Sequence, residues 1–323
     1  MSPLQLHAPN EKLFYSRNDP DDPRLGDVVI APEGKLTGVP EEARVVILGV
    51  PQDVGVKRNL GRVGAAGGPE AIRRALYRLA AWDAERKRSI PKGFLCDLGD
   101  IDCSGELEDI HRRLSDVVEE IVRQKRVPVV IGGGHDITYG AFCGVHRVHG
   151  TLGAFNFDAH LDVRPADSGS HSGTSFRMLI DEEKIDTTRC IQFGIQPFAN
   201  AAAHAEWFEG SGGVIRTLET IRRVGITGSL SATLRVARSG RLPYYATLDL
   251  DAVRAAEAPG VSAPMPDGFE AADLMATARA LGADPWCVAL DVAEMNPEYD
   301  QDGMTARLAA HAIARFVSEV VGR

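Results

Sequence analysis

Three side chains that bind metal ions well fall at alternate positions in one short segment of the sequence. Asp158, His160 and Asp162 lie in FNFDAHLDVRP, residues 155–165. An extended strand sends alternate side chains to opposite faces, so these three would share one face of such a strand. A metal site follows from this pattern only if further ligands of the same kind come from elsewhere in the chain.

Two other polar clusters also accompany short apolar runs. The sequence GGGHD, which contains His135, comes directly after VPVVI, and TLDLD, which contains Asp249 and Asp251, overlaps the end of YYATLDL. The glycines resemble a phosphate-binding loop only superficially, because no Lys-Ser or Lys-Thr pair follows them. Taken singly, each cluster has an ordinary interpretation, in which an aspartate caps the next helix and a histidine makes a hydrogen bond.

Taken together, the three clusters indicate a binuclear metal site. Four carboxylates and two imidazoles at one edge of a sheet would be costly to bring together unless cations neutralised them. Histidine and aspartate ligands without a thiolate suit manganese, among other divalent ions, better than a structural zinc site. Two such ions about 3.5–4 Å apart can share a water molecule and lower its pKa, so the predicted chemistry is hydrolysis.

The elements that must position these ligands alternate between apolar runs and amphipathic stretches. Residues 107–121 and 309–320 carry apolar side chains at helical spacing, and the apolar runs between such stretches read as buried strands. This alternation predicts a mostly parallel sheet with helices on both faces, in which ligands bind at the carboxyl ends of the strands. The predicted strands are residues 44–50, 93–98, 127–131, 152–157, 190–195, 213–216, 244–250 and 286–290.

The amino-acid composition of the chain limits the kinds of molecule that it is expected to bind. The 323 residues carry a net charge of −9 and no concentrated basic run, so we expect neither nucleic acid nor an anionic membrane as a partner. No apolar run is long enough to span a bilayer, and the five cysteines contain no CxxC pair, as expected of a cytoplasmic enzyme with free thiols. Residues 41–323 are predicted to form one catalytic domain, preceded by an N-terminal arm at residues 1–40, either an ordered lid or a mobile segment.

GGGHD, FDAHLD and TLDLD, in this order, resemble the three metal-binding signatures of the ureohydrolase superfamily, which includes arginase, agmatinase and formimidoylglutamase. The resemblance implies an arginase-like fold, a three-layer α/β/α sandwich, with two Mn²⁺ per subunit in a homo-oligomer, a trimer or hexamer. It also implies that Asp162 lies beside the attacking hydroxide. The implied ligands are His135, Asp158, Asp162 and Asp249 for one ion, and Asp158, His160, Asp249 and Asp251 for the other.

Two further segments are most similar to the formimidoylglutamase branch. VKRNLGRVGAAGGPEAIRRAL supplies Asn59 and Arg62, and DVAEMNPEYDQDGMTAR supplies Glu294, which by resemblance grips the amidine nitrogens of the substrate. Arginases and agmatinases usually carry Asp-Pro where this chain has Arg254-Ala255. The branch implies hydrolysis of N-formimino-L-glutamate to L-glutamate and formamide, a step of histidine breakdown.

Several assignments keep alternatives. Asn59, Arg62 and Arg177 are candidates for holding substrate carboxylates, because a guanidinium fork suits a carboxylate, although Arg62 could instead form a salt bridge. His171, in GSHSGTSFR, is a candidate proton shuttle whose alternative is a solvated loop histidine. The whole chain could also be an agmatinase or another guanidino-acid hydrolase that releases urea, or a metal-binding relative without catalytic activity.

Overall fold

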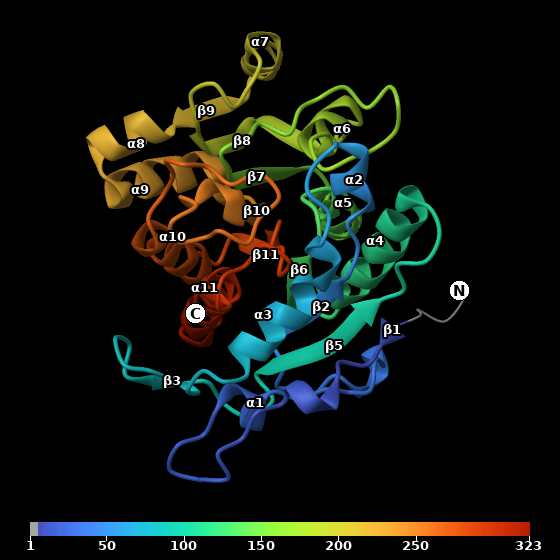
Figure 1. Ribbon diagram of the computed structural model, residues 1–323, viewed down its shortest axis with the longest axis vertical. Coiled ribbons are helices and arrows are strands. Elements are labelled where there is room, and N and C mark those ends of the chain that lie inside the picture. Colours follow the sequence, from blue (N-terminus) through green and yellow to red (C-terminus); the bar gives the residue numbers. More distant parts are fainter. Residues whose placement is uncertain (1–5) are drawn as a thin grey trace.

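A nine-stranded sheet forms the centre of the computed structural model, which describes residues 6–323 (Figure 1). Neighbouring strands run parallel except at one edge, where β1 pairs antiparallel with β5. In spatial order the strands are β1 (Leu6–His7), β5 (Leu95–Ile101), β2 (Val45–Val50), β6 (Val127–Gly132), β11 (Cys287–Ala293), β10 (Tyr244–Asp249), β7 (Leu152–Phe157), β8 (Ile185–Ile195) and β9 (Val214–Thr217).

The central strands form where the sequence is apolar without interruption. β2, with the sequence VVILGV, and β7, with LGAFNF, are buried at every position, as expected of strands covered on both faces. All eight predicted strands are present; β7 has the predicted bounds, and the other seven have at least one shifted end. β8 begins at Ile185, five residues before the predicted start, because its first half is polar and partly exposed and carries no apolar run.

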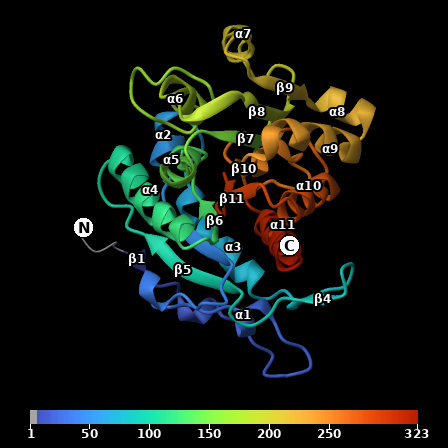
Figure 2. The same ribbon diagram turned by 180° about the vertical axis from the view of Figure 1, so that it is seen from behind.

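Helices cover both faces of the sheet, so the molecule has three layers (Figures 1 and 2). Alternate residues of β2 enter different cores, Val45 and Ile47 on one face and Val46 and Leu48 on the other. The first core includes side chains of α3 (Gly68–Leu76), α8 (Leu218–Val224), α9 (Ile226–Ala237), α10 (Ala271–Ala283) and α11 (Met304–Val321). The second includes side chains of α4 (Leu107–Arg123), α5 (Ile137–His149), α6 (Ser175–Asp181) and α7 (Ala202–Gly210). This is the three-layer α/β/α sandwich that the sequence predicts.

Residues 6–40 lie along the β5 edge of the sheet. Leu6 pairs with Ile101, and Leu13, Leu25 and Val29 are buried. Short helical turns connect this segment, namely η1 (Glu11–Leu13), α1 (Leu25–Val28) and η2 (Leu36–Gly38). The first five residues of the predicted N-terminal arm lie outside the described part of the chain.

The remaining elements are short. β3 (Trp82–Asp83) and β4 (Arg88–Ser89) pair as a two-stranded ribbon. Four short helical elements lie between longer ones: α2 (Val54–Arg58), η3 (Ala65–Gly67), η4 (Ser239–Arg241) and η5 (Leu250–Ala252). Between residues 6 and 323, no helix combines the length and the apolarity that crossing a membrane requires.

Candidate metal centre and active site

Four adjacent strands bring the predicted ligands to one edge of the sheet. β6, β11, β10 and β7 are neighbours, and His135, Glu294, Asp249 and Asp158 lie at or just after their carboxyl ends. Because these strands are parallel, the segments that follow them emerge at the same edge. The topology therefore gathers side chains that are more than 150 residues apart in the sequence.

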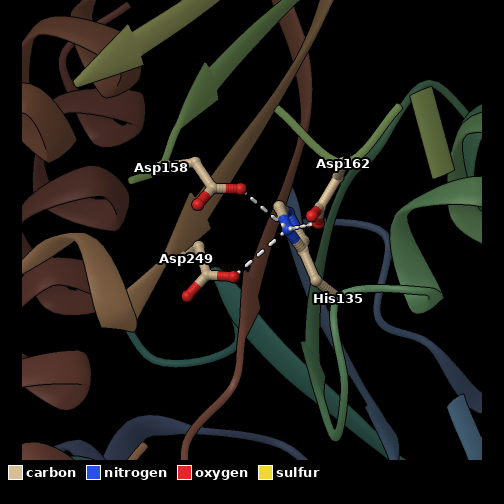
Figure 3. Close-up of side chains that lie close together, drawn as sticks. All are labelled: His135, Asp158, Asp162 and Asp249. Carbon is tan, nitrogen blue, oxygen red and sulfur yellow. Dashed lines mark hydrogen bonds and ion pairs between the residues drawn. The ribbon is translucent and has the colours of Figure 1, made fainter. Parts of the chain in front are cut away.

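The first group of ligands surrounds one nitrogen of His135 (Figure 3). Nδ1 of His135 lies 2.8 Å from Oδ2 of Asp162, 3.1 Å from Oδ2 of Asp158 and 3.2 Å from Oδ2 of Asp249. All four ligand atoms lie within 4.8 Å of one another. One nitrogen and three carboxylate oxygens thus converge on a single point.

The second group shares Asp158 with the first. Nδ1 of His160 lies 3.2 Å from Oδ2 of Asp251 and 3.5 Å from Oδ1 of Asp158. The two oxygens of Asp158 therefore face different groups, which suits a carboxylate that bridges two cations. Asp249, the other expected bridge, faces His135 with Oδ2 and accepts the backbone N–H of Asp251 at 2.8 Å with Oδ1.

The electrostatics of this cluster favour cation binding. Burial raises the pKa of Asp249 well above its usual value, and the neighbouring Asp251 and Asp158 raise it further. Burial opposes a charged His135, yet the surrounding carboxylates hold the pKa of its imidazole well above normal. Oxygen and imidazole donors without a thiolate, crowded together in a buried cluster, suit two manganese ions.

Glu294 approaches the cluster from the end of β11. Its Oε1 accepts the backbone N–H of His135 at 2.9 Å, and its Oε2 accepts the hydroxyl of Ser262. Burial, followed by the charge of Asp251, raises the pKa of Glu294 to about 8. Glu294 and Asp162 both have left-handed backbones, with φ of 67° and 51°, a conformation that non-glycine residues rarely adopt.

A cavity of about 370 Å³ opens above the cluster. Its walls combine the metal-ligand candidates with polar side chains from four other segments of the chain. The lining includes His135, His160, Asp162, Asp249, Asp251, Glu294, Asn59, Arg62, Arg164, Ser172, Asn200, His204 and Ser262.

Two of the three predicted carboxylate-binding residues line this cavity. The Nε–H of Arg62 donates to the carbonyl oxygen of Ser262 at 3.1 Å, and its guanidinium stacks 4.0 Å above the ring of Tyr299. Asn59 uses both ends of its amide, because Nδ2 donates to Ser172 Oγ at 2.9 Å and Oδ1 accepts from Arg164 at 2.6 Å. Asn59 therefore holds Arg164 in place at the cavity wall.

Arg177 and His171 are not among the residues that line the cavity. The Nε–H of Arg177 donates to Asp181 at 2.7 Å within α6, and its guanidinium stacks 3.9 Å from the ring of Trp207. In this structure Arg177 therefore faces Trp207 of α7 and not the cavity, and its contact with a substrate carboxylate stays a prediction. His171 is half-buried and accepts the backbone N–H of Gly173 at 3.1 Å, and burial lowers the pKa of its imidazole.

Two ionisable residues that line the cavity, Arg164 and His204, were absent from the sequence prediction. Arg164 follows Asp162 by two residues and continues the alternation that identified Asp158, His160 and Asp162, so its signal was present. His204 lies on α7, more than 40 residues after the nearest metal motif, and no local pattern marks it.

Comparisons with known proteins agree with this geometry. The arginase family model matches residues 43–318. Over 284 residues the chain is 37% identical to a formimidoylglutamase of Geobacillus thermodenitrificans, which covers 86% of this chain and 84% of the relative. It is 33% identical over 319 residues to the formimidoylglutamase of Aeromonas hydrophila, with 94% and 96% covered. The crystal structure of Trypanosoma cruzi formiminoglutamase with Mn²⁺ superposes with a TM-score of 0.86 at 32% identity, covering 94% of this chain and 100% of that one.

Proposed function

Because the chain belongs to the arginase family, we propose that it is a formimidoylglutamase, a binuclear manganese hydrolase that converts N-formimino-L-glutamate and water to L-glutamate and formamide. The observation that carries the proposal is the convergence of two ligand groups and Glu294 on one cavity. The substrate in this proposal is taken from the names of similar relatives, which are formimidoylglutamases.

The ligand groups divide between two ions. His135, Asp158, Asp162 and Asp249 would hold one, and Asp158, His160 and Asp251 the other. The family resemblance adds Asp249 to the second group. When bound, the manganese pair supplies Lewis acidity and a water molecule of lowered pKa. The aspartates supply the negative charge that balances the cations.

Glu294 orients the substrate. Backbone N–H of His135 and the Ser262 hydroxyl fix its carboxylate, so its free lone pairs point to a defined place in the cavity. There the carboxylate accepts N–H groups of the formimino amidinium and turns the planar carbon toward the cluster. Asp162 then accepts the proton of the attacking water and passes it to the leaving amine.

Two guanidiniums supply charge for the substrate carboxylates. Arg62 and Arg164 line the cavity, and between residues 6 and 323 neither forms an ion pair with an acidic side chain. N-formimino-L-glutamate carries two carboxylates, whereas agmatine carries none. Arginines left without acidic partners in the same cavity therefore favour the diacid as substrate.

The test is a comparison of substrates. Purified Mn²⁺-loaded protein would be offered N-formimino-L-glutamate, arginine and agmatine separately, with formamide and urea measured, and Asp249→Ala as the inactive control. We expect formamide from the first substrate and no urea from the others. Urea from arginine or agmatine would replace the proposed substrate, and a protein loaded with manganese but inert to all three would indicate a binding function.

We further propose that the enzyme works in the cytoplasm in histidine breakdown, as a trimer or hexamer whose catalytic unit is residues 41–323. The five free cysteines support a reducing compartment. Light scattering on the purified protein tests the assembly, and growth of a deletion strain on histidine as sole nitrogen source tests the pathway.

A further inference from the structure

A buried hydrogen-bond network reaches the side of His135 that faces away from the ligand group. Nε2 of His135 lies 2.8 Å from Oγ1 of Thr247, and Oγ1 of Thr247 is hydrogen-bonded in turn to Oδ1 of Asp291. His135, Thr247 and Asp291 are all buried. The two nitrogens of this ring thus have different surroundings, three carboxylates at Nδ1 and one hydroxyl at Nε2.

The protons in this network can be assigned one by one. Oδ2 of Asp291 receives two further hydroxyl contacts, from Thr138 at 2.9 Å and from Tyr245 at 2.6 Å. An ionised carboxylate only accepts, so the hydroxyl protons of Thr138, Tyr245 and Thr247 all point to Asp291. Thr247 has one proton, and since that proton is given to Asp291, its oxygen accepts from His135. Nε2 of His135 therefore carries the hydrogen.

A neutral imidazole with its hydrogen on Nε2 has its lone pair on Nδ1. That lone pair points into the group formed by Asp158, Asp162 and Asp249. The opposite tautomer would place an N–H bond there, which would satisfy one carboxylate and exclude a cation from the nitrogen.

We propose that Asp291 and Thr247 are positioning residues that fix the Nε2–H tautomer and the ring orientation of His135, and so set the affinity of one of the two cation sites. The inference rests on the proposed function only in requiring a divalent cation at this centre, and the identity of the substrate does not enter. Outer partners of a metal-binding histidine typically contribute 10–100-fold to metal affinity.

The second histidine provides an internal contrast. The described part of the chain offers no hydrogen-bond partner to Nε2 of His160, whose contacts are made by Nδ1 to Asp158 and Asp251. The side chain of His160 is 22% exposed, against 1% for His135. A change at Thr247 should therefore weaken one ion and leave the other in place.

The experiment is a Mn²⁺ titration of metal-free protein, followed by calorimetry and by electron paramagnetic resonance, without substrate. Thr247→Val removes the hydroxyl at nearly constant volume, and we expect one of the two ions to bind about 10–100-fold more weakly. The coupled two-ion resonance signal should give way to that of a single ion at limiting Mn²⁺. Thr247→Ser restores a hydroxyl and should restore both affinities.

Tyr245→Phe is the matched control, because it removes a buried hydrogen bond to Asp291 without touching His135. It should bind both ions as the unaltered protein does. The proposal would be overturned if Thr247→Val bound both ions with the affinities of the unaltered protein. It would also be overturned if Tyr245→Phe lost as much affinity as Thr247→Val. If Thr247→Val fails to fold, Asp291→Asn provides the same test, with the same loss expected. If the titrations of the unaltered protein, Thr247→Val and Tyr245→Phe come out as expected but the substrate assay fails, the proposed function alone is overturned.

Discussion

Replacing Glu294 by Gln separates substrate recognition from metal binding. The change keeps the shape of the side chain and an oxygen for the backbone N–H of His135, but removes the charge that faces the cavity. A carboxylate gripping an amidinium makes two charge-assisted hydrogen bonds of about 1.5–3 kcal/mol each. The amide retains one neutral bond of about 0.5–1.5 kcal/mol, so the net loss is about 2.5–4.5 kcal/mol.

This loss corresponds to a fall in kcat/KM of about 60–1,600-fold, since about 1.4 kcal/mol is a factor of ten. The assay measures formamide release by Mn²⁺-loaded enzyme, with manganese content determined on the same sample. Glu298→Gln is the matched control, because Glu298 is exposed on the same segment and does not line the cavity. We expect Glu294→Gln to hold two ions and Glu298→Gln to be fully active.

Two results would refute the reasoning about Glu294. Retention of more than about a tenth of the original kcat/KM would show that the carboxylate does not hold the amidinium. Loss of manganese together with activity would show that Glu294 acts on the cluster through its bond to His135, rather than on the substrate.

Three further predictions concern the centre, its protons and its specificity. Asp249→Ala should lose manganese and activity together, because it removes a carboxylate that would serve both ions; metal analysis of the purified variant checks this. The stabilisation by Mn²⁺ should grow as pH rises from about 4.5 to about 8. Over this window the metal-free protein loses stability, because the pKa of Glu294 is about 8 in the folded protein and 4.5 for an ordinary glutamate, so only the folded state keeps this proton. Melting curves with and without Mn²⁺ measure this difference, and an increment that shrinks with pH would contradict the sign. Arg164→Ala should raise KM for N-formimino-L-glutamate by about 10–100-fold, as loss of a charge-assisted hydrogen bond implies, while Arg177→Ala leaves KM unchanged.

The parts of the site that follow strands directly were predictable from the sequence. Each motif follows or ends an apolar run whose strand is buried on both faces. The two-residue spacing of Asp158, His160 and Asp162 identified the ligands, but the shared strand face expected from it does not form, because β7 ends at Phe157 and Asp162 has a left-handed backbone. Tyr245 and Thr247 precede Asp249 at the same two-residue spacing in YYATLDL. The sequence therefore also contained a signal for the hydrogen-bond network of Tyr245, Thr247 and Asp291. Asp291 itself lies in a motif that was recognised for Glu294 alone.

Contacts between distant segments set the limit of prediction. Arg177 carries a guanidinium, which is suited to binding a carboxylate. In the fold, however, this group stacks on Trp207, which lies thirty residues later in the sequence. β1 and the β3–β4 ribbon are only two residues long per strand and have no periodicity to detect. Which side chain enters a cavity depends on loop directions that only the assembled sheet determines.

The left-handed backbones of Asp162 and Glu294 carry a cost in stability. Each residue adopts a conformation that glycine would adopt without penalty, at a cost on the order of 1–3 kcal/mol, with the smaller part expected at Asp162 because aspartate tolerates this region best. Glycine at position 294 would remove this strain, but it would also leave the backbone N–H of His135 and the hydroxyl of Ser262 without their acceptor, at about 1–3 kcal/mol for a buried donor. The carboxylate that is proposed to hold the substrate therefore also offsets the strain of the backbone that presents it.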